Sequence, residues 1–421
     1  MLRDYCCCFY GARSSGPTDR DPVVLISGIA GSILNSKPKK LGFETRVWVR
    51  ILLADLEFKK KLWSIYNPDT GYTEALDDNT EIVVPQDDYG LYAIDILDPS
   101  VMLVGCGYKK GTTLFGYGYD FRQSNRIGQL MDGLKEKLEA AYKASGGRKV
   151  NIISHSMGGL LVTCFISLHS EIFSRYVNKW ITIATPFQGA PGCINDSILT
   201  GLQFVEGFES FFFVSRWSMH QLLVECPSVY EMLPNPDFNW KKQPEIQVWR
   251  KHSNDGESSV ELETYGRNEC VTLFEEALKN NELNIGGKTV ALPFNVAILE
   301  WAATTRELIN KTQLPNGVSF YNIYGTSFDT PFDVCYGSES TPIDDLSEIC
   351  HTLPEYSYVD GDGTVPSESA MGDNFEAAER VGVSASHRGL LTDESVFQLI
   401  QKWLQVSPNT KNSKVMHAYS T

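Results

Sequence analysis

The chain has 421 residues, of which 42% are hydrophobic, and its net charge is −15. This length allows one large domain with insertions or two domains. The acidic balance excludes broad binding of nucleic acids and disfavours electrostatic docking on anionic membranes. The ten cysteines include no pair with zinc-like spacing and no cluster with histidine, so we predict neither a metal nor another cofactor.

The two ends of the chain are predicted to be disordered, as a leader over residues 1–20 and a tail over residues 407–421. No apolar run is long enough for a signal peptide or a membrane span, so a cytoplasmic protein with reduced cysteines is expected. Three adjacent cysteines, Cys6, Cys7 and Cys8, are candidates for palmitoylation.

A buried parallel strand is predicted at residues 23–26, where four apolar residues follow one another. Gly28 and Gly31 then end the strand in a tight turn. This turn, G-I-A-G-S, lacks both the lysine of a phosphate-binding P-loop and the glycine fingerprint of a dinucleotide site.

The connection over residues 41–92 is unusually long for a link between two strands and is predicted to be an insertion. Within it, residues 47–63 have helical spacing and include a lysine run at 59–61. Two interpretations stay open. The segment is a helix packed on the core, or an interfacial segment in which Trp48 and Trp63 anchor at a lipid boundary and the lysines face headgroups.

Strands and helices alternate from residue 113 onward. Residues 113–122 (T-L-F-G-Y-G-Y-D-F-R) predict a strand that ends in a polar turn, and residues 125–145 predict an amphipathic helix that Gly146 and Gly147 terminate. Another buried strand follows Lys179. This alternation predicts a mostly parallel sheet.

The segment of residues 150–161, V-N-I-I-S-H-S-M-G-G-L-L, passes from a strand through a small polar turn into an apolar helix. Its S-H-S-M-G differs at one position from G-x-S-x-G, the nucleophile elbow of α/β hydrolases, because Ser154 replaces the first glycine. S-x-S-x-G alone occurs by chance in serine-rich loops. The strand–turn–helix context favours the elbow, so Ser156 is the predicted nucleophile.

Two backbone N–H groups are predicted to stabilise an oxyanion at this serine. One belongs to Met157, at the start of the helix, where the helix dipole also favours negative charge. Given the elbow, the early glycine turn is the place for the second donor, which is Ala30, or Ile29 if the register differs by one residue.

The alternation of strands and helices stops between residues 187 and 314, which are predicted to form a cap or lid. The two flanking segments, residues 21–186 and 315–406, would form the core, with a membrane-binding insertion within residues 32–92. The aromatic residues of one short stretch are buried in the cap or line a mobile lid over an apolar site. These candidates for lipid contact are Phe211, Phe212, Phe213 and Trp217.

A serine nucleophile needs a histidine base and a carboxylate that orients it, in the order Ser, Asp or Glu, His in this fold. His351 and His387 lie in the returning core, but only His387 follows the carboxylate turn D-G-D-G-T. That turn lacks the further ligands of a calcium loop. Asp360 and Asp362 compete as the acid, and the glycines on both sides of Asp362 favour it. The sequence therefore predicts the triad Ser156–His387–Asp362.

With these residues in place, the chain resembles the lecithin:cholesterol acyltransferase family, above all its plant branch that includes cytosolic phospholipase A enzymes. The resemblance covers residues 22–404 and rests on several motifs, among them G-Y-D-F-R, I-S-H-S-M-G-G-L-L, A-T-P-F-Q-G-A-P and D-G-D-G-T-V-P. It implies an α/β-hydrolase fold, the same triad and an oxyanion position at Ala30. It also implies a membrane-binding subdomain around residues 35–70 and a lid around residues 200–220.

Two features depart from the family pattern. Secreted members hold the early membrane-binding loop with a disulfide, whereas no cysteine lies between Cys8 and Cys106, which favours an intracellular enzyme. The family also has a helix before the G-Y strand, and residues 98–109 are expected to leave no room for one. A missing core helix before residue 107 would leave a catalytically impaired, lipid-binding variant.

The predicted reaction is ping-pong acyl transfer from a phospholipid at a peripheral membrane surface. Water as acceptor releases a fatty acid, which is phospholipase A activity. An alcohol such as a sterol as acceptor gives an ester, which is O-acyltransferase activity. A soluble esterase or peptidase is a further alternative, but the aromatic cap and the Trp-flanked segment favour a lipid substrate.

Overall fold

The computed structural model describes residues 20–40, 42–48, 61–77, 79–94, 99–203, 215–254, 257–267, 269–285 and 287–407. Several predictions concern residues outside these ranges: the leader before residue 20, the three adjacent cysteines, most of the helical segment at 47–63, the three phenylalanines at 211–213, and the tail from residue 408.

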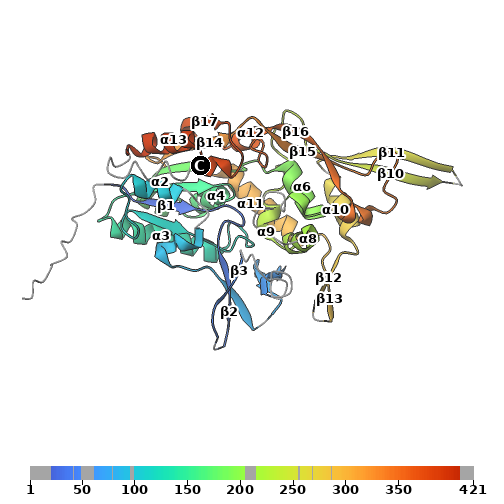
Figure 1. The fold of residues 1–421 in the computed structure, drawn as a ribbon, viewed down its shortest axis with the longest axis horizontal. Coiled ribbons are helices and arrows are strands. Elements are labelled where there is room, and N and C mark those ends of the chain that lie inside the picture. Colours follow the sequence, from blue (N-terminus) through green and yellow to red (C-terminus); the bar gives the residue numbers. More distant parts are fainter. Residues whose placement is uncertain are drawn as a thin grey trace, which may run out of the picture.

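A six-stranded sheet forms the centre of the molecule (Figure 1). All of its neighbouring strands are parallel, in the order β17, β14, β9, β8, β1, β7. The strands are β1 (Val23–Ile26), β7 (Leu114–Tyr117), β8 (Val150–His155), β9 (Val177–Ile183), β14 (Ser319–Gly325) and β17 (Ala377–Val383). Together with the helices on both faces, this sheet gives the α/β-hydrolase fold that the sequence predicts.

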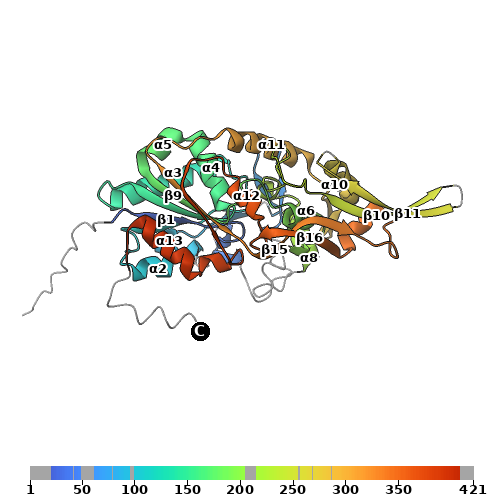
Figure 2. The same ribbon diagram turned by 90° about the horizontal axis from the view of Figure 1, so that it is seen from above.

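Helices cover both faces of the sheet (Figure 2). Because side chains alternate along a strand, Val24 and Ile26 belong to one apolar cluster, and Val23 and Leu25 belong to another on the opposite face. The first face is covered by α3 (Gly128–Ala144), α4 (Gly158–Leu168) and α5 (Ser170–Tyr176), and α11 (Val296–Lys311) packs on α4. The second is covered by α2 (Pro99–Gly105) and α13 (Glu394–Leu404).

The connection that precedes β7 contains a helix, α2, so the prediction that it has no room for one is wrong. Seven residues of helix need only about 10 Å of length, and Met102, Leu103 and Cys106 are fully buried beneath the sheet. The apolar cluster on this face is therefore filled. The argument for an impaired enzyme loses its structural basis.

The early insertion is built from strands. A three-stranded sheet contains β2 (Leu34–Pro38), β3 (Thr45–Trp48) and β6 (Thr80–Val83), and a hairpin contains β4 (Ser64–Tyr66) and β5 (Thr73–Ala75). The segment predicted as a helix thus begins as a strand. Trp48 is 0% exposed and Trp63 is 1% exposed, so the interpretation of these two indoles as lipid anchors is wrong.

Arg122, from the G-Y-D-F-R motif, connects the insertion to the core. Its guanidinium is buried and binds both carboxylate oxygens of Asp120, at 2.9 and 2.7 Å. The same group donates to the backbone carbonyl of Leu62 at 2.7 Å and to Ser64 Oγ at 3.2 Å. A single buried cation therefore joins β4 and the residues just before it to the turn that follows β7.

A second layer lies beside the parallel sheet and is built from the region between β9 and β14 together with two strands that follow β14 (Figure 1). Its mixed sheet has the order β11 (Glu257–Tyr265), β10 (Ile246–Asn254), β15 (Phe328–Tyr336) and β16 (Pro354–Gly361). Around it lie α6 (Pro191–Leu199), α8 (Arg216–Leu223), α9 (Pro227–Tyr230), α10 (Cys270–Leu278) and the hairpin of β12 (Glu282–Ile285) and β13 (Lys288–Ala291). The role of this region as a cap stays a prediction.

The remaining short elements lie in connections. They are the 3₁₀ helices η1 (Asp88–Gly90), η2 (Tyr92–Ile94), η3 (Leu346–His351) and η4 (Gly389–Leu391) and the short helix α12 (Ser367–Met371).

Replacement of Arg122 with methionine should lower the free energy of unfolding by about 3–5 kcal/mol, because the Asp120 carboxylate would stay buried without its partner. Lys311→Met is the control: it breaks an ion pair with Glu307 that is exposed on α11, and should cost less than about 1 kcal/mol. Denaturant unfolding measures both. Equal values would contradict the role of Arg122 as the buried link.

Candidate active site

Ser156 occupies the sharp turn between β8 and α4, with a positive φ of 52°. The small residues around it are required by close packing. A Cβ on Gly158 would lie 2.5 Å from the backbone oxygen of Ser27. Ser154, which stands where a glycine is usual, fits because its hydroxyl accepts a hydrogen bond from Trp180 Nε1 at 2.9 Å. The elbow predicted from the sequence is therefore present in geometry.

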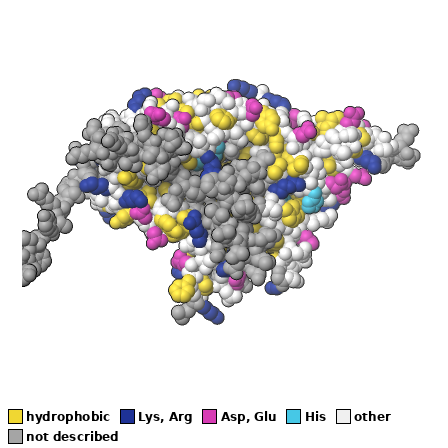
Figure 3. Space-filling model, viewed as in Figure 1, with side chains coloured by type: hydrophobic (Ala, Val, Ile, Leu, Met, Phe, Trp, Pro, Cys, Tyr) yellow, Lys and Arg dark blue, Asp and Glu magenta, His cyan; other side chains and the backbone are white. Residues whose placement is uncertain are grey.

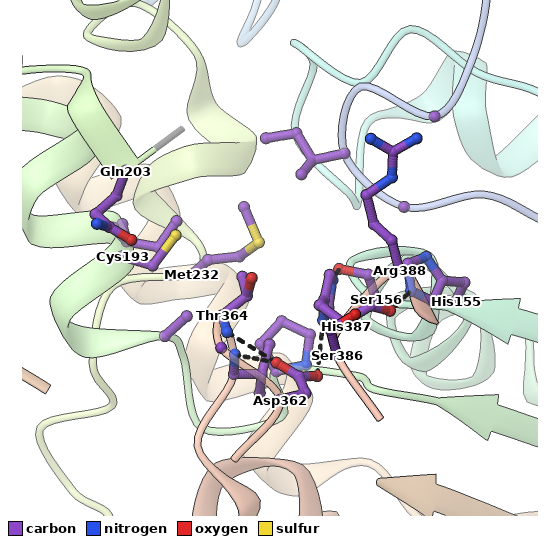
Figure 4. A pocket seen from close by; sticks show the side chains of 18 of the residues that line it. His155, Ser156, Cys193, Gln203, Met232, Asp362, Thr364, Ser386, His387 and Arg388 are labelled. Carbon is purple, nitrogen blue, oxygen red and sulfur yellow. Dashed lines mark hydrogen bonds and ion pairs between the residues drawn. The ribbon is translucent and has the colours of Figure 1, made fainter. Parts of the chain in front are cut away.

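The three residues predicted as a triad lie in one hydrogen-bonded chain (Figure 4). Ser156 Oγ is 2.9 Å from His387 Nε2, and His387 Nδ1 is 2.8 Å from Asp362 Oδ2. Ser156 and Asp362 are 5% and 1% exposed, which shields the chain from water. This arrangement can take a proton from the serine hydroxyl while a carboxylate orients the histidine.

Asp362 is held by the loop that follows β16. Its Oδ1 accepts hydrogen bonds from the N–H groups of Thr364 at 2.9 Å and Val365 at 2.7 Å, which leaves Oδ2 for His387. The competing Asp360 is exposed and instead accepts hydrogen bonds from Ser327 and Ser367. Of the two aspartates, only Asp362 contacts the histidine.

His155, which precedes the serine, contacts the backbone of the catalytic histidine. Its Nε2 lies 3.1 Å from the backbone carbonyl of His387 and donates to it, and the two rings are 4.8 Å apart. Burial, together with the neighbouring His387, lowers the pKa of His155 to about 3. His155 therefore stays neutral and holds the His387 loop in place. The sequence showed the residue but not this contact.

The glycine turn after β1 lies against the elbow. A Cβ on Gly28 would be 2.7 Å from Ser156 Cβ, so only glycine lets the turn come this close. Ala30 has a φ of 59°, and its carbonyl accepts a hydrogen bond from Trp48 Nε1 at 2.8 Å. Trp48, proposed above as a lipid anchor, instead fixes the backbone of this turn.

A cavity of about 370 Å³ opens over Ser156. One wall is apolar and is formed by Pro186, Ala190, Cys193, Ile194 and Met232. The opposite side carries His387 and the guanidinium of Arg388 (Figure 4).

The glycine turn contributes Gly28, Ile29 and Gly31 to the lining of this cavity, which does not include Ala30. Trp217 is also outside the lining: it is half-buried, with its ring centroid 4.9 Å from that of His220 and 4.8 Å from that of His351.

Stability should fall as the pH drops from about 6.5 towards 4, partly because of His155. Its folded pKa of about 3 lies below the ordinary histidine value near 6.5, so in this window the unfolded chain binds the extra proton and acid favours unfolding. His155→Gln should reduce the slope of unfolding free energy against pH.

His169→Gln, at the end of α4, is the matched control for loss of a histidine. An unchanged slope in His155→Gln, measured by denaturant unfolding at several pH values, would contradict a buried neutral His155.

Comparisons with known proteins agree with this geometry. The family model described as lecithin:cholesterol acyltransferase matches residues 55–383. Phospholipase A(1) LCAT3 of Arabidopsis thaliana is 70% identical over 420 residues, which cover 95% of this chain and 94% of the relative. Lecithin-cholesterol acyltransferase-like 4, also of Arabidopsis thaliana, is 52% identical over 404 residues, with 92% of this chain and 76% of the relative covered.

A solved structure shares the fold. A chain of the Tle4–Tli4 complex has a TM-score of 0.51 and 14% identity, with 92% of this chain and 99% of that chain covered. The motifs, the sheet, the site and the two plant relatives lead to one conclusion: this chain belongs to the lecithin:cholesterol acyltransferase family, in its plant lecithin-cholesterol acyltransferase-like branch.

Proposed function

We propose that the protein is a serine-dependent lipid acyl hydrolase, a phospholipase A that releases a fatty acid from a glycerophospholipid. The observation that carries this proposal is the buried chain from Ser156 through His387 to Asp362 beneath a cavity with one apolar wall. An acyl chain fits the apolar wall, and its ester would lie over the serine. The apolar wall favours a lipid over a polar ester or a peptide.

The reaction runs in two steps. His387 Nε2 takes the proton from Ser156 Oγ as that oxygen attacks the ester carbonyl carbon, and the carbonyl oxygen becomes an oxyanion. His387 then gives the proton to the glycerol oxygen, the ester bond breaks, and a lysophospholipid leaves. Water next loses a proton to His387 and attacks the acyl-enzyme. The fatty acid departs as Ser156 Oγ regains the proton.

Backbone N–H groups of two turns would hold the oxyanion. In the part of the chain that the structure describes, no acceptor is assigned to the N–H groups of Ile29, Ala30 or Met157. Met157 follows the nucleophile directly. Of the two candidates in the glycine turn, we favour Ile29, because it lines the cavity and Ala30 does not.

Transfer of the acyl group to an alcohol is the second candidate activity, and the match to an acyltransferase family favours it. The chemistry differs only in the second step, where an alcohol such as a sterol replaces water. Its product is an ester in place of a free fatty acid.

Ser156→Ala should lower the turnover of phosphatidylcholine vesicles by about 10⁴-fold or more, because the attacking oxygen is lost. Products resolved by mass, with and without a sterol, identify the acceptor: fatty acid plus lysophospholipid for water, sterol ester for transfer. A product that persists in Ser156→Ala would contradict the role of the serine. No product from the wild type would contradict the proposed activity and leave a lipid-binding role.

We also propose that the protein works at the surface of intracellular membranes from the cytoplasmic side. Within the described ranges, no helix has both the length and the apolar character to cross a bilayer. The segment between β2 and β3 exposes Phe43 by 94%, beside the exposed Lys37, Lys39 and Lys40. Figure 3 shows basic and hydrophobic side chains together on this projection. An apolar tip with adjacent cations is typical of an interfacial anchor.

Phe43→Ser should weaken binding to phosphatidylcholine vesicles by roughly tenfold, because an aromatic ring no longer leaves water. Leu168→Ser, which removes an exposed apolar side chain at the end of α4, is the control and should have little effect. Co-sedimentation measures both. Equal losses in the two variants would place the membrane contact elsewhere.

A further inference from the structure

A second cavity, with a volume of about 270 Å³, is lined by residues of α10, α11 and the chain that follows α9 (Figure 1). Among the described residues, none lines both this cavity and the one over Ser156. The two cavities are neighbours, because Met232 lines the first while Glu231 and Leu233 line the second. The second cavity is therefore a separate compartment, and the reaction steps above leave it without a ligand.

The wall of the second cavity has an apolar, aromatic part. Phe274 of α10 and Phe294 are buried and stacked, with ring centroids 5.0 Å apart, and Leu299 of α11 lies in the same lining. Ala303 and Glu307, on successive turns of α11, are exposed members of the lining, so a ligand can enter from this side. The volume lies just below the range of about 300–1,000 Å³ typical of pockets for drug-sized molecules. It suits a short aliphatic chain and not a whole phospholipid.

Arg306 of α11 brings a cation to this cavity. The residue is 8% exposed, and its guanidinium donates to the backbone carbonyls of Phe187 at 2.5 Å and Glu231 at 2.9 Å. Neither acceptor carries a charge. Within the described ranges, Arg306 forms no ion pair, and its remaining N–H groups have no acceptor. A buried positive charge thus lines the cavity without a bound counter-ion.

The acidic groups of the lining do not supply that counter-ion. The Glu231 carboxyl accepts hydrogen bonds from other residues, and burial raises its pKa, which favours its neutral form. Asp237 and Glu307 each form an ion pair with another residue. Burial lowers the pKa of Arg306 to about 10, so the group stays charged at pH 7 at a cost in free energy. An anion in the cavity would offset this cost.

We propose that the second cavity binds an aliphatic monocarboxylate, such as a short fatty acid, with its carboxylate at Arg306 and its chain along the aromatic wall. The planar guanidinium matches the two oxygens of a carboxylate. The wall of Phe274 and Phe294 takes the apolar chain out of water. Because the site lies outside the catalytic cavity, the inference goes beyond the proposed phospholipase function and does not depend on it.

Titration calorimetry of the full chain with octanoate tests where the ligand binds. Ala303→Phe places a ring at the entrance and should raise the Kd by about tenfold or more, because the bulky side chain competes for the space. Thr304→Phe, exposed at the next position of α11 and outside the lining, is the matched control and should change the Kd by less than about twofold. Full affinity in Ala303→Phe would place octanoate elsewhere and overturn the proposal, as would a wild type that does not bind octanoate.

Arg306→Gln tests the charge. The Kd of octanoate should rise by about tenfold, because a charge-assisted hydrogen bond is lost. The Kd of 1-octanol, which has the same chain without the charge, should change by less than about twofold. Arg306→Lys should recover part of the octanoate affinity, since the charge returns without the planar fork. Equal changes for the two ligands would make Arg306 a structural link alone and overturn the proposal. Ala303→Phe keeps the buried guanidinium, so its result decides the matter even where Arg306→Gln does not fold.

Discussion

The close approach of two turns at the carboxyl ends of β1 and β8 is the constraint on which the rest of the site depends. Gly28 lies so near Ser156 that no side chain fits between them, and Ser156 itself has a positive φ. Strain of this kind persists only where the surrounding structure determines it. Here the parallel pairing of β1 with β8 supplies that restraint.

Buried polar contacts attach the additional layers to this centre. Glu225 accepts hydrogen bonds from the backbone of Tyr66 in β4 and from Asn295 at the start of α11, so it links the insertion to the region beside the sheet. Glu231 accepts hydrogen bonds from Asn125, just before α3, and from Thr305 in α11, so it links these two segments. Burial raises the pKa of both carboxyl groups. The elements around the catalytic cavity are thus tied together by hydrogen bonds as well as by apolar packing.

The sequence predicted the elements whose signals are local. Ser156, Asp362 and His387 stand in short patterns and in a fixed chain order, and the structure brings them together. The helix expected at residues 125–145 is observed as α3, because its apolar spacing is regular over several turns.

Trp48 and α2 were not predictable in this way. A tryptophan beside lysines fits a membrane interface and a buried core equally well, and only the tertiary contact with Ala30 decides. A helix as short as α2 has too few residues to show a period. The contact between His155 and His387 also joins residues distant in the chain, so no local sequence pattern predicts it.

The base and the acid lie more than 200 residues after the serine, in loops that follow β16 and β17. A chain emerging from the ribosome therefore carries its nucleophile long before it carries the groups that activate it. β17, the edge strand that positions the histidine loop, pairs with β14, so the final strand of the sheet must dock first. The order of the chain therefore delays assembly of the Ser156–His387–Asp362 chain until β17 has paired with β14.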